Sequence, residues 1–241
     1  MAPDTLSQTQ KALLDLRQRI LSGAIVGGTR LYEVALAEEL ATSRTPVRAA
    51  LSRLAEEGLL ERGRGGGFVV RSFALADVVD TIDLRGVLEG TAARYAAERG
   101  IGPEQLAQAQ TILREIDRIL SGHAIDMAAY SRLNTRFHAI LAQMSQSTTL
   151  QRELARITAL PFASPSAFLE DHNRPESLQR TMTVAQAQHH AILEAIVARE
   201  SARAEAVTRE HARAARRNVE FLLSQEAALR EGVPSLALLS N

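Results

Sequence analysis

The sequence predicts a mainly α protein, in which a small unit of three helices and a β-hairpin precedes an all-α antiparallel helical bundle. Up to Ser72, apolar residues at helical spacing give way to two short apolar segments around a glycine-rich turn. From Leu75 onward, the helical spacing continues almost to the end. The 241 residues are 46% hydrophobic and 4% aromatic, with a formal net charge of zero, which is typical of a helix-rich globular protein. We therefore expect two domains, at 6–73 and 75–230.

The first domain has the order of elements of a winged helix-turn-helix. We expect a helix from Leu6 to Leu21, a turn in "VGGTRL" at 26–31 and a short helix at about 33–41. The third helix takes Ser43 as its N-cap and ends at Gly58, because glycine favours a helix end. "LLERGRGGGFVV" at 59–70 then predicts a hairpin with its tip at 62–67.

The start of the third helix, "SRTPVRAAL" at 43–51, carries two arginines where the helix dipole favours acidic residues. Residues 41–71 hold six Arg against three Glu, so an anionic partner is indicated. In a helix-turn-helix this helix enters the major groove, where arginine suits guanine and hydroxyl groups hold phosphate. The candidate DNA-binding residues are Ser43, Arg44, Thr45, Arg48, Arg62, Arg64, Gly65 and Gly66. The alternative is a solvated basic helix end beside a flexible hairpin.

The segment "LYEVALAEELATSRTPVRAALSRLAEEGLLERGRGGGFVV" resembles the DNA-binding domain of the GntR family of bacterial transcription regulators. The shared features are L-x-E-x-x-L-A, S-R-T-P-V-R-x-A-L, L-x-x-E-G-L and the glycine-rich wing, over residues 10–72. The resemblance implies that Arg44 and Arg48 contact bases and backbone, with Thr45 beside them. Val34 departs from an arginine of many members, and "LATS" from "LGVS", which leaves room for a different operator sequence.

The second domain is predicted to be helical at about 75–99, 103–121, 125–145, 148–160, 180–199 and 201–229. The segment 161–178 contains three prolines and is expected to be a loop or a broken helix. Three imidazoles and one amide lie on otherwise apolar faces of three of these helices: Asn134, His138, His189 and His211. Neutral histidines around a cation satisfy such positions by coordination, whereas an isolated buried histidine is more often a hydrogen-bonded core residue.

This domain resembles the FCD ligand-binding domain of the FadR-type subfamily of GntR regulators. Its marks are Arg85-x-x-x-Glu89, N-x-x-F-H at 134–138, H-x-x-I-L-x-A-I at 189–196 and His211. The resemblance implies a divalent metal ion, zinc or nickel, held by Asn134 and the three histidines. Asn134 replaces the usual Asp, which weakens one ligand and leaves the site more positive. Arg85 and Asn218 are then expected to bind the effector, although Arg85 also suits a salt bridge with Glu89.

These features indicate a transcription regulator and not an enzyme. We expect a homodimeric repressor that binds a palindromic operator in double-stranded DNA and senses a small carboxylate. The alternatives are a metal-free sensor of larger acyl-type effectors, and a metal-dependent hydrolase fused to a nucleic-acid module. The start of the sequence has no signal-peptide pattern, no apolar run reaches membrane-span length, and there is no cysteine. We therefore expect a cytoplasmic protein without a membrane partner.

Overall fold

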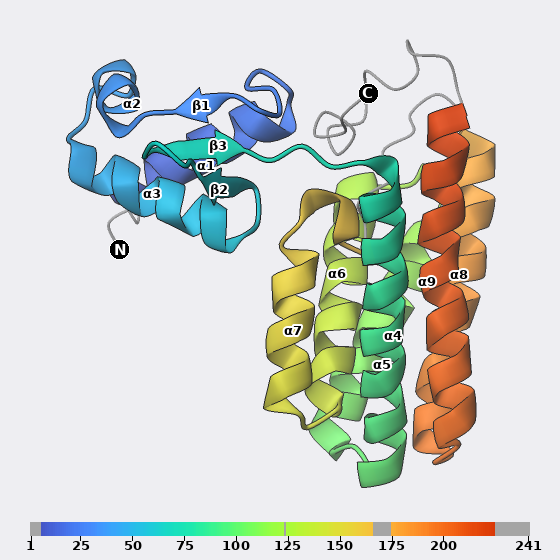
Figure 1. Cartoon of the computed structure of the whole chain (residues 1–241). Coiled ribbons are helices and arrows are strands. Elements are labelled where there is room, and N and C mark those ends of the chain that lie inside the picture. The colour runs from blue at the N-terminus through green and yellow to red at the C-terminus, as the bar shows by residue number, and fades with distance from the viewer. Residues whose placement is uncertain (1–5, 123, 166–174, 225–241) are drawn as a thin grey trace, which may run out of the picture. The chain divides into compact units, whose positions relative to one another are not determined.

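The computed structural model describes residues 6–122, 124–165 and 175–224 (Figure 1). The described chain divides into two compact units, with the boundary between Leu75 and Ala76. The expected mainly α fold class is confirmed: one small sheet accompanies a series of helices in the described residues. Each unit is described by itself below.

The first unit comprises α1 (Gln8–Leu21), β1 (Arg30–Leu31), α2 (Glu33–Glu39), α3 (Arg44–Glu56), β2 (Leu60–Arg62) and β3 (Phe68–Val70). α3 packs against both α1 and α2. Leu16 and Ile20 of α1 and Leu51 and Leu54 of α3 are fully buried, so these helices share one apolar core. The core leaves the N-terminal end of α3 at the surface.

The three strands form one antiparallel sheet in the order β1-β3-β2. Phe68 pairs with Leu31 on one side and with Arg62 on the other. Between β2 and β3, Gly66 and Gly67 have φ angles of +87° and +73°, a region that glycine adopts without strain. This geometry produces the hairpin that the sequence predicts.

Two details of the first unit differ from expectation. The segment 26–31 was expected to be only a turn, but Arg30 and Leu31 form β1. A two-residue strand carries no periodic signal, because its pairing with β3 decides it. Ser43 stands at the N-cap position of α3, but its side chain makes no capping hydrogen bond.

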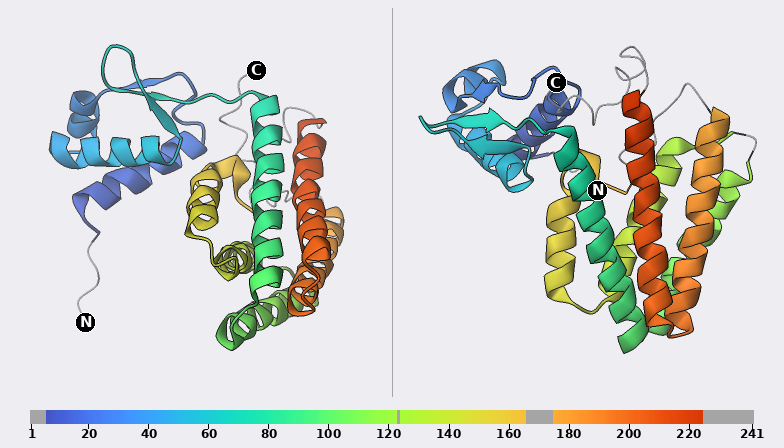
Figure 2. Two further views of the ribbon diagram at one scale, coloured as in Figure 1. Left: turned by 60° about the horizontal axis from the view of Figure 1, so that its bottom comes forward. Right: turned by 45° about the vertical axis from the view of Figure 1, so that its right-hand side comes forward.

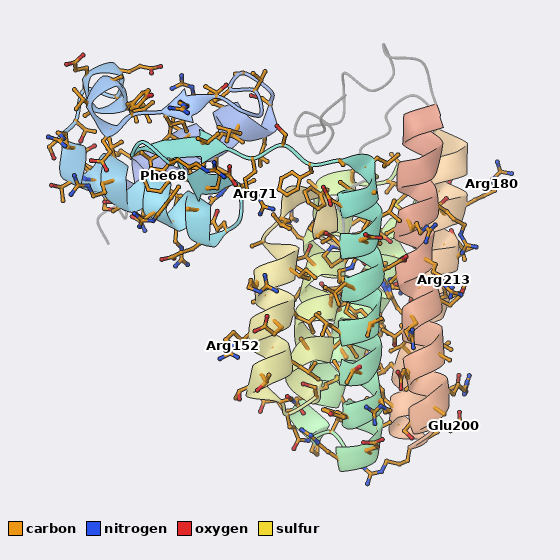
Figure 3. All side chains as sticks on the ribbon, viewed as in Figure 1. Phe68, Arg71, Arg152, Arg180, Glu200 and Arg213 are labelled. Carbon is orange, nitrogen blue, oxygen red and sulfur yellow. The ribbon has the colours of Figure 1, made fainter. Side chains whose placement is uncertain are left out.

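The second unit is a helical bundle of α4 (Leu75–Arg99), α5 (Pro103–Leu120), α6 (Met127–Met144), α7 (Thr148–Thr158), α8 (Pro175–Val197) and α9 (Ser201–Ser224). A short 3₁₀ turn, η1 (Pro161–Ala163), follows α7. α8 packs along α9 and α5, and α5 packs along α6. Figure 2 shows α8 and α9, in orange and red, beside each other. Charged side chains such as Arg152 of α7 and Arg213 of α9 point outward from the bundle (Figure 3).

The bundle core lies between α4, α5, α6 and α8, and includes Ala93, Ile112, Phe137 and Ile192. α4 and α9 approach each other closely, because a Cβ at Gly86 would lie 2.7 Å from that of Ala212. The expected helices are all present within the described residues, although α8 begins at Pro175, before the expected 180. Close packing of α4, α6, α8 and α9 brings their polar side chains together inside the bundle.

Candidate functional site

The structure brings together three of the predicted site residues. His138 of α6, His189 of α8 and His211 of α9 are all buried, and their possible ligand atoms lie within 4.8 Å of one another. The Nε2 atom of His211 is 3.1 Å from Nε2 of His189 and 3.3 Å from Nε2 of His138. We call these three residues the histidine cluster.

The opposite nitrogen of each ring contacts an oxygen. His138 Nδ1 lies 2.9 Å from Oε1 of Glu89. His189 Nδ1 and His211 Nδ1 each lie 3.1 Å from a glutamine oxygen, of Gln186 and Gln188 respectively. Ionised carboxylates and amide oxygens only accept hydrogen bonds, so each Nδ1 is the donor. When the three rings are neutral, each Nε2 atom therefore carries a lone pair, and the three lone pairs face one another.

This protonation pattern suits a cation. Three lone pairs at such distances repel one another, and a divalent ion between them turns the repulsion into coordination. The oxygens that accept from Nδ1 fix the ring orientation and raise ligand basicity, as in many metal sites. Gln186 is itself held: its amide nitrogen donates to Asp117 Oδ1 at 2.8 Å and to the Leu113 carbonyl at 3.0 Å. The cluster thus has the donor atoms and the supporting contacts of a three-histidine metal site.

The ionisation states agree with this arrangement. Burial, with the neighbouring histidines adding to it, lowers the pKa of His189 well below its ordinary value. Burial and the charge of His138 lower the pKa of His211 to about 3. Burial alone would raise the pKa of Glu89, but the charges of His138 and Arg85 outweigh it and lower that pKa to about 2. At neutral pH, His189 and His211 are therefore neutral imidazoles and Glu89 is a carboxylate.

Asn134, the fourth predicted ligand, is buried on α6, one turn before His138. Its Nδ2 donates to the Pro165 carbonyl at 3.1 Å. Together with His211 and Arg85 it lines a small cavity of about 30 Å³. Its place in the coordination sphere stays a prediction.

Arg85 is buried on α4, where its Nη1 donates to the Ala163 carbonyl at 2.8 Å. Its Nε lies 3.8 Å from Oε2 of Glu89. Neither of these two atoms has a hydrogen-bond partner among the described residues. The ion pair between Arg85 and Glu89, one of the two expected roles of Arg85, is thus present. Nε of Arg85 can still donate a hydrogen bond, and Oε2 of Glu89 can still accept one. The role of Arg85 in effector binding stays a prediction, and the side chain of Asn218 lies outside the described residues.

A second cavity, of about 330 Å³, lies beside the histidine cluster. Glu89 and His138 form part of its wall, and Ala139, Ala142 and Leu154 give it an apolar lining. Its volume is at the low end of the range for small-molecule sites. This cavity cannot be predicted from sequence spacing, because its wall combines residues of α4, α6 and α7 with Ser164 and Pro165.

The predicted DNA-binding residues form a second candidate site, on the first unit. Arg44, Thr45 and Arg48 are exposed in the first turns of α3, and Arg62, Arg64, Gly65 and Gly66 are exposed at the hairpin. Both arginines of α3 contact Glu33: Arg48 Nη2 lies 2.8 Å and Arg44 Nη2 3.7 Å from Oε2. The sequence contained Glu33 within its L-x-E motif, but a motif does not show which arginines the acid contacts.

The residues that contact the Nδ1 atoms of the histidine cluster were not predicted from the sequence either. Glu89 was expected only as a partner of Arg85, and Gln186 and Gln188 were not among the expected site residues. Gln186 stands three residues before His189, which places both on one helix face and was the only available signal. His190 lies outside the cluster and contacts Asp117 at 3.1 Å.

Comparison with known proteins assigns both units. Residues 8–70 match the model of the bacterial regulatory proteins of the gntR family, and residues 80–214 match the FCD domain. The chain belongs to the GntR family of bacterial transcription regulators, with an FCD domain. The family and its relatives are transcription regulators, not enzymes.

Several curated relatives of this GntR regulator are themselves regulators of operons. The Nta operon transcriptional regulator of Aminobacter aminovorans is 36% identical over 54% of this chain and 60% of its own length. The galactonate operon transcriptional repressor of Escherichia coli is 27% identical over 80% of this chain and 88% of its own length. The Glc operon transcriptional activator of Escherichia coli is 25% identical over 91% of this chain and 92% of its own length.

Solved structures share the fold of this GntR regulator. Escherichia coli McbR/YncC has a TM-score of 0.61 at 24% identity, covering 92% of this chain and 99% of its own. The Lar protein of Listeria monocytogenes has a TM-score of 0.67 at 18% identity, covering 91% and 99%. In the part of the chain that the structure describes, no helix is both long and apolar enough to cross a bilayer.

Proposed function

We propose that this GntR regulator is a metal-containing, metabolite-responsive repressor. A divalent metal ion, zinc or nickel, is bound by His138, His189 and His211, with Asn134 as a further ligand. A small carboxylate effector binds at this metal and changes the affinity of a homodimer for a palindromic operator. The observation that carries the proposal is the convergence of three buried Nε2 atoms whose Nδ1 atoms all face oxygens.

The donor set supports zinc or nickel over harder ions. Imidazole nitrogen is a ligand of choice for zinc and nickel, whereas magnesium and calcium prefer oxygen. Three histidines leave coordination positions open, so an effector oxygen has a place at the metal. When bound, the ion supplies positive charge that favours an anionic ligand, and the neutral amide of Asn134 does not reduce that charge.

The cavities support a small effector. The cavity of about 30 Å³ next to Arg85 and His211 has room for a carboxylate-sized group. The cavity of about 330 Å³ beside His138 accommodates a small metabolite but is small for a long acyl chain. The operon of one relative is named for galactonate, a carboxylate. These points favour a small acid over the alternative of a metal-free sensor of larger acyl-type effectors.

The DNA-binding part of the proposal rests on the exposed arginines of α3. Arg44 and Arg48 read bases in the major groove, Ser43 and Thr45 hold phosphate, and the hairpin at 62–67 contacts the neighbouring groove or backbone. One such unit covers few base pairs, so a dimer on a two-fold symmetric site supplies the required specificity. Repression is proposed because two relatives are named as repressors, of D-xylose utilisation and galactonate operons, although the Glc relative is named as an activator.

Metal analysis and calorimetry test this function. Purified protein is expected to hold close to one zinc or nickel ion per chain. Titration with a panel of small carboxylates is expected to give binding only for metal-loaded protein, and the corresponding primary amides serve as matched controls without the charge. Binding of an acid that is equally strong after complete metal removal would contradict the proposed sensor mechanism.

A further inference from the structure

One carboxylate engages both arginines that are proposed to read DNA. Glu33 lies in the first turn of α2, and Arg48 Nε donates to both of its oxygens at 2.9 Å. Arg48 Nη2 lies 2.8 Å from Oε2 of Glu33, and Arg44 Nη2 lies 3.7 Å from the same oxygen. A single acid on α2 therefore holds Arg48 by hydrogen bonds and forms a looser ion pair with Arg44 at the start of α3.

The exposed fractions of these side chains show that Glu33 lies deeper in the surface than the two arginines. The side chain of Glu33 is 18% exposed, whereas those of Arg44 and Arg48 are each 61% exposed. The hydrogen bond from Arg48 lowers the pKa of Glu33, and Glu33 in turn raises the pKa of Arg48. Both partners are thus charged at neutral pH, with the acid beneath and the guanidinium groups toward the outside.

We propose that Glu33 is a positioning residue that determines the specificity of DNA recognition. This inference rests on the proposal that α3 reads the operator. The carboxylate accepts hydrogen bonds along one edge of the Arg48 guanidinium, from Nε and Nη2. The edge that includes Nη1 remains available to an acceptor on the DNA. A guanidinium held in this way is already oriented for a two-point contact with guanine, which requires a fixed plane.

The charge of Glu33 adds a second contribution to specificity. On an unrelated sequence, Arg44 and Arg48 can contact only phosphates, and the negative charge of Glu33 beside both arginines weakens their attraction to phosphate. On the correct sequence, the base contact uses the donors that the carboxylate leaves available. Glu33 therefore weakens binding to wrong sites more than to the right one, because discrimination is a difference between two affinities.

A purely structural role for Glu33 is the competing explanation. An acidic residue in the first turn of a helix stabilises that helix through its dipole, and Glu33 has this position in α2. Such a role predicts lower stability of the folded domain, and equal changes in affinity for all DNA sequences. The two explanations therefore differ in the ratio of specific to non-specific affinity.

The test uses full-length protein and two duplexes of equal length, one selected from a random pool by the wild-type protein and one unrelated. In Glu33→Gln, affinity for the unrelated duplex is expected to rise about threefold to tenfold, with a log-affinity against log-salt slope steeper by about one. The ratio of the two affinities is expected to fall about tenfold or more. The double variant Glu33→Gln/Arg48→Ala should lower the ratio of specific to non-specific affinity little further, because both substitutions remove the same contact between an oriented Arg48 and a base.

Glu57→Gln is the matched control. Glu57 is 20% exposed and binds Arg17 at 2.7 Å, so it loses the same charge from a similar ion pair at the other end of α3. If Glu33→Gln folds poorly, Glu33→Asp keeps the charge but shortens the reach, and should lower only the ratio. A Glu33→Gln ratio equal to that of Glu57→Gln, or equal losses on both duplexes, would overturn the inference. If Arg44→Ala and Arg48→Ala also leave operator binding unchanged, the proposed function of α3 itself is wrong.

Discussion

The two units use charge in opposite ways. On the first unit, Arg44 and Arg48 are exposed and both form ion pairs with Glu33 at the surface. In the second, His189 and His211 are buried, and burial keeps them neutral. An exposed cation suits a polyanion that approaches from solvent, whereas a buried neutral base suits an ion bound inside the protein. The difference between the two sites therefore matches the two proposed ligands: charged, exposed side chains for DNA and neutral, buried side chains for a metal ion.

The largest expected effect is the loss of a buried ligand. His189→Ala and His211→Ala should each lower metal affinity by more than about 100-fold, because each removes one of three nitrogens. Metal content after dialysis against a weak chelator measures this. His190→Ala is the control, since His190 neighbours His189 in sequence but contacts Asp117 instead. Metal loss in His190→Ala comparable to that in the ligand variants would contradict the assignment.

A second prediction concerns the pH dependence of stability in metal-free protein. The pKa of His211 is about 3 in the folded state and about 6.5 in the unfolded chain, so only the unfolded state takes up a proton between these values. The free energy of unfolding should therefore be unaffected above pH 6.5 and should fall as pH drops toward 3. His211 contributes on the order of 4 kcal/mol to this fall.

Glu89 extends the same trend to lower pH. Its pKa of about 2 in the folded state lies below the ordinary value of 4.5, so its stabilising effect is present above pH 4.5 and is lost as pH falls toward 2. Urea unfolding of metal-free protein at a series of pH values checks both groups. His211→Gln should reduce the slope of the curve between pH 6.5 and 3, whereas the loss of stability that Glu89 causes between pH 4.5 and 2 should remain. A wild-type curve that is flat over the upper range would show that the histidines are not buried in the neutral form.

The exposed arginines should give smaller effects. Arg44→Ala and Arg48→Ala are each expected to weaken operator binding by about 1–3 kcal/mol if they contact bases. Arg53→Ala is the control, because Arg53 is equally exposed at 64% but lies near the C-terminal end of α3. Fluorescence anisotropy with a selected operator measures the difference. Equal affinities for the three variants and wild type would remove α3 from the DNA interface.

Local features of both units were predicted from the sequence, whereas contacts between different elements were not. Motif density and helical spacing located α3 and the three histidines, because both signals are local. β1 was missed, since a two-residue strand exists only through its partner β3. The contacts of Glu89 with His138 and of Glu33 with Arg48 join residues on different elements, and no spacing rule reports them. Long-range pairing and the shape of the cavity near His138 therefore required the folded structure.

At position 134, the hydrogen bond to Pro165 favours an amide side chain, whereas metal binding would favour a carboxylate. Its amide Nδ2 donates to the Pro165 carbonyl at 3.1 Å, and a carboxylate cannot make this bond. Without metal, Asn134→Asp therefore places a buried negative charge beside a carbonyl oxygen, which should lower the melting temperature. With metal, the same carboxylate becomes a stronger ligand than the amide.

Asn134→Asp should accordingly tighten metal binding by about tenfold. Competition with a chromophoric chelator gives the affinity, and melting curves with and without saturating zinc give the stability. The variant should be less stable than wild type without zinc and should gain more stability from zinc, since the metal compensates the new charge. Asn134→Ala separates the two contributions, because it loses the bond to Pro165 without adding a ligand and should only lower stability. If Asn134→Asp loses the same stability with and without zinc, Asn134 does not contact the metal and has only a structural role.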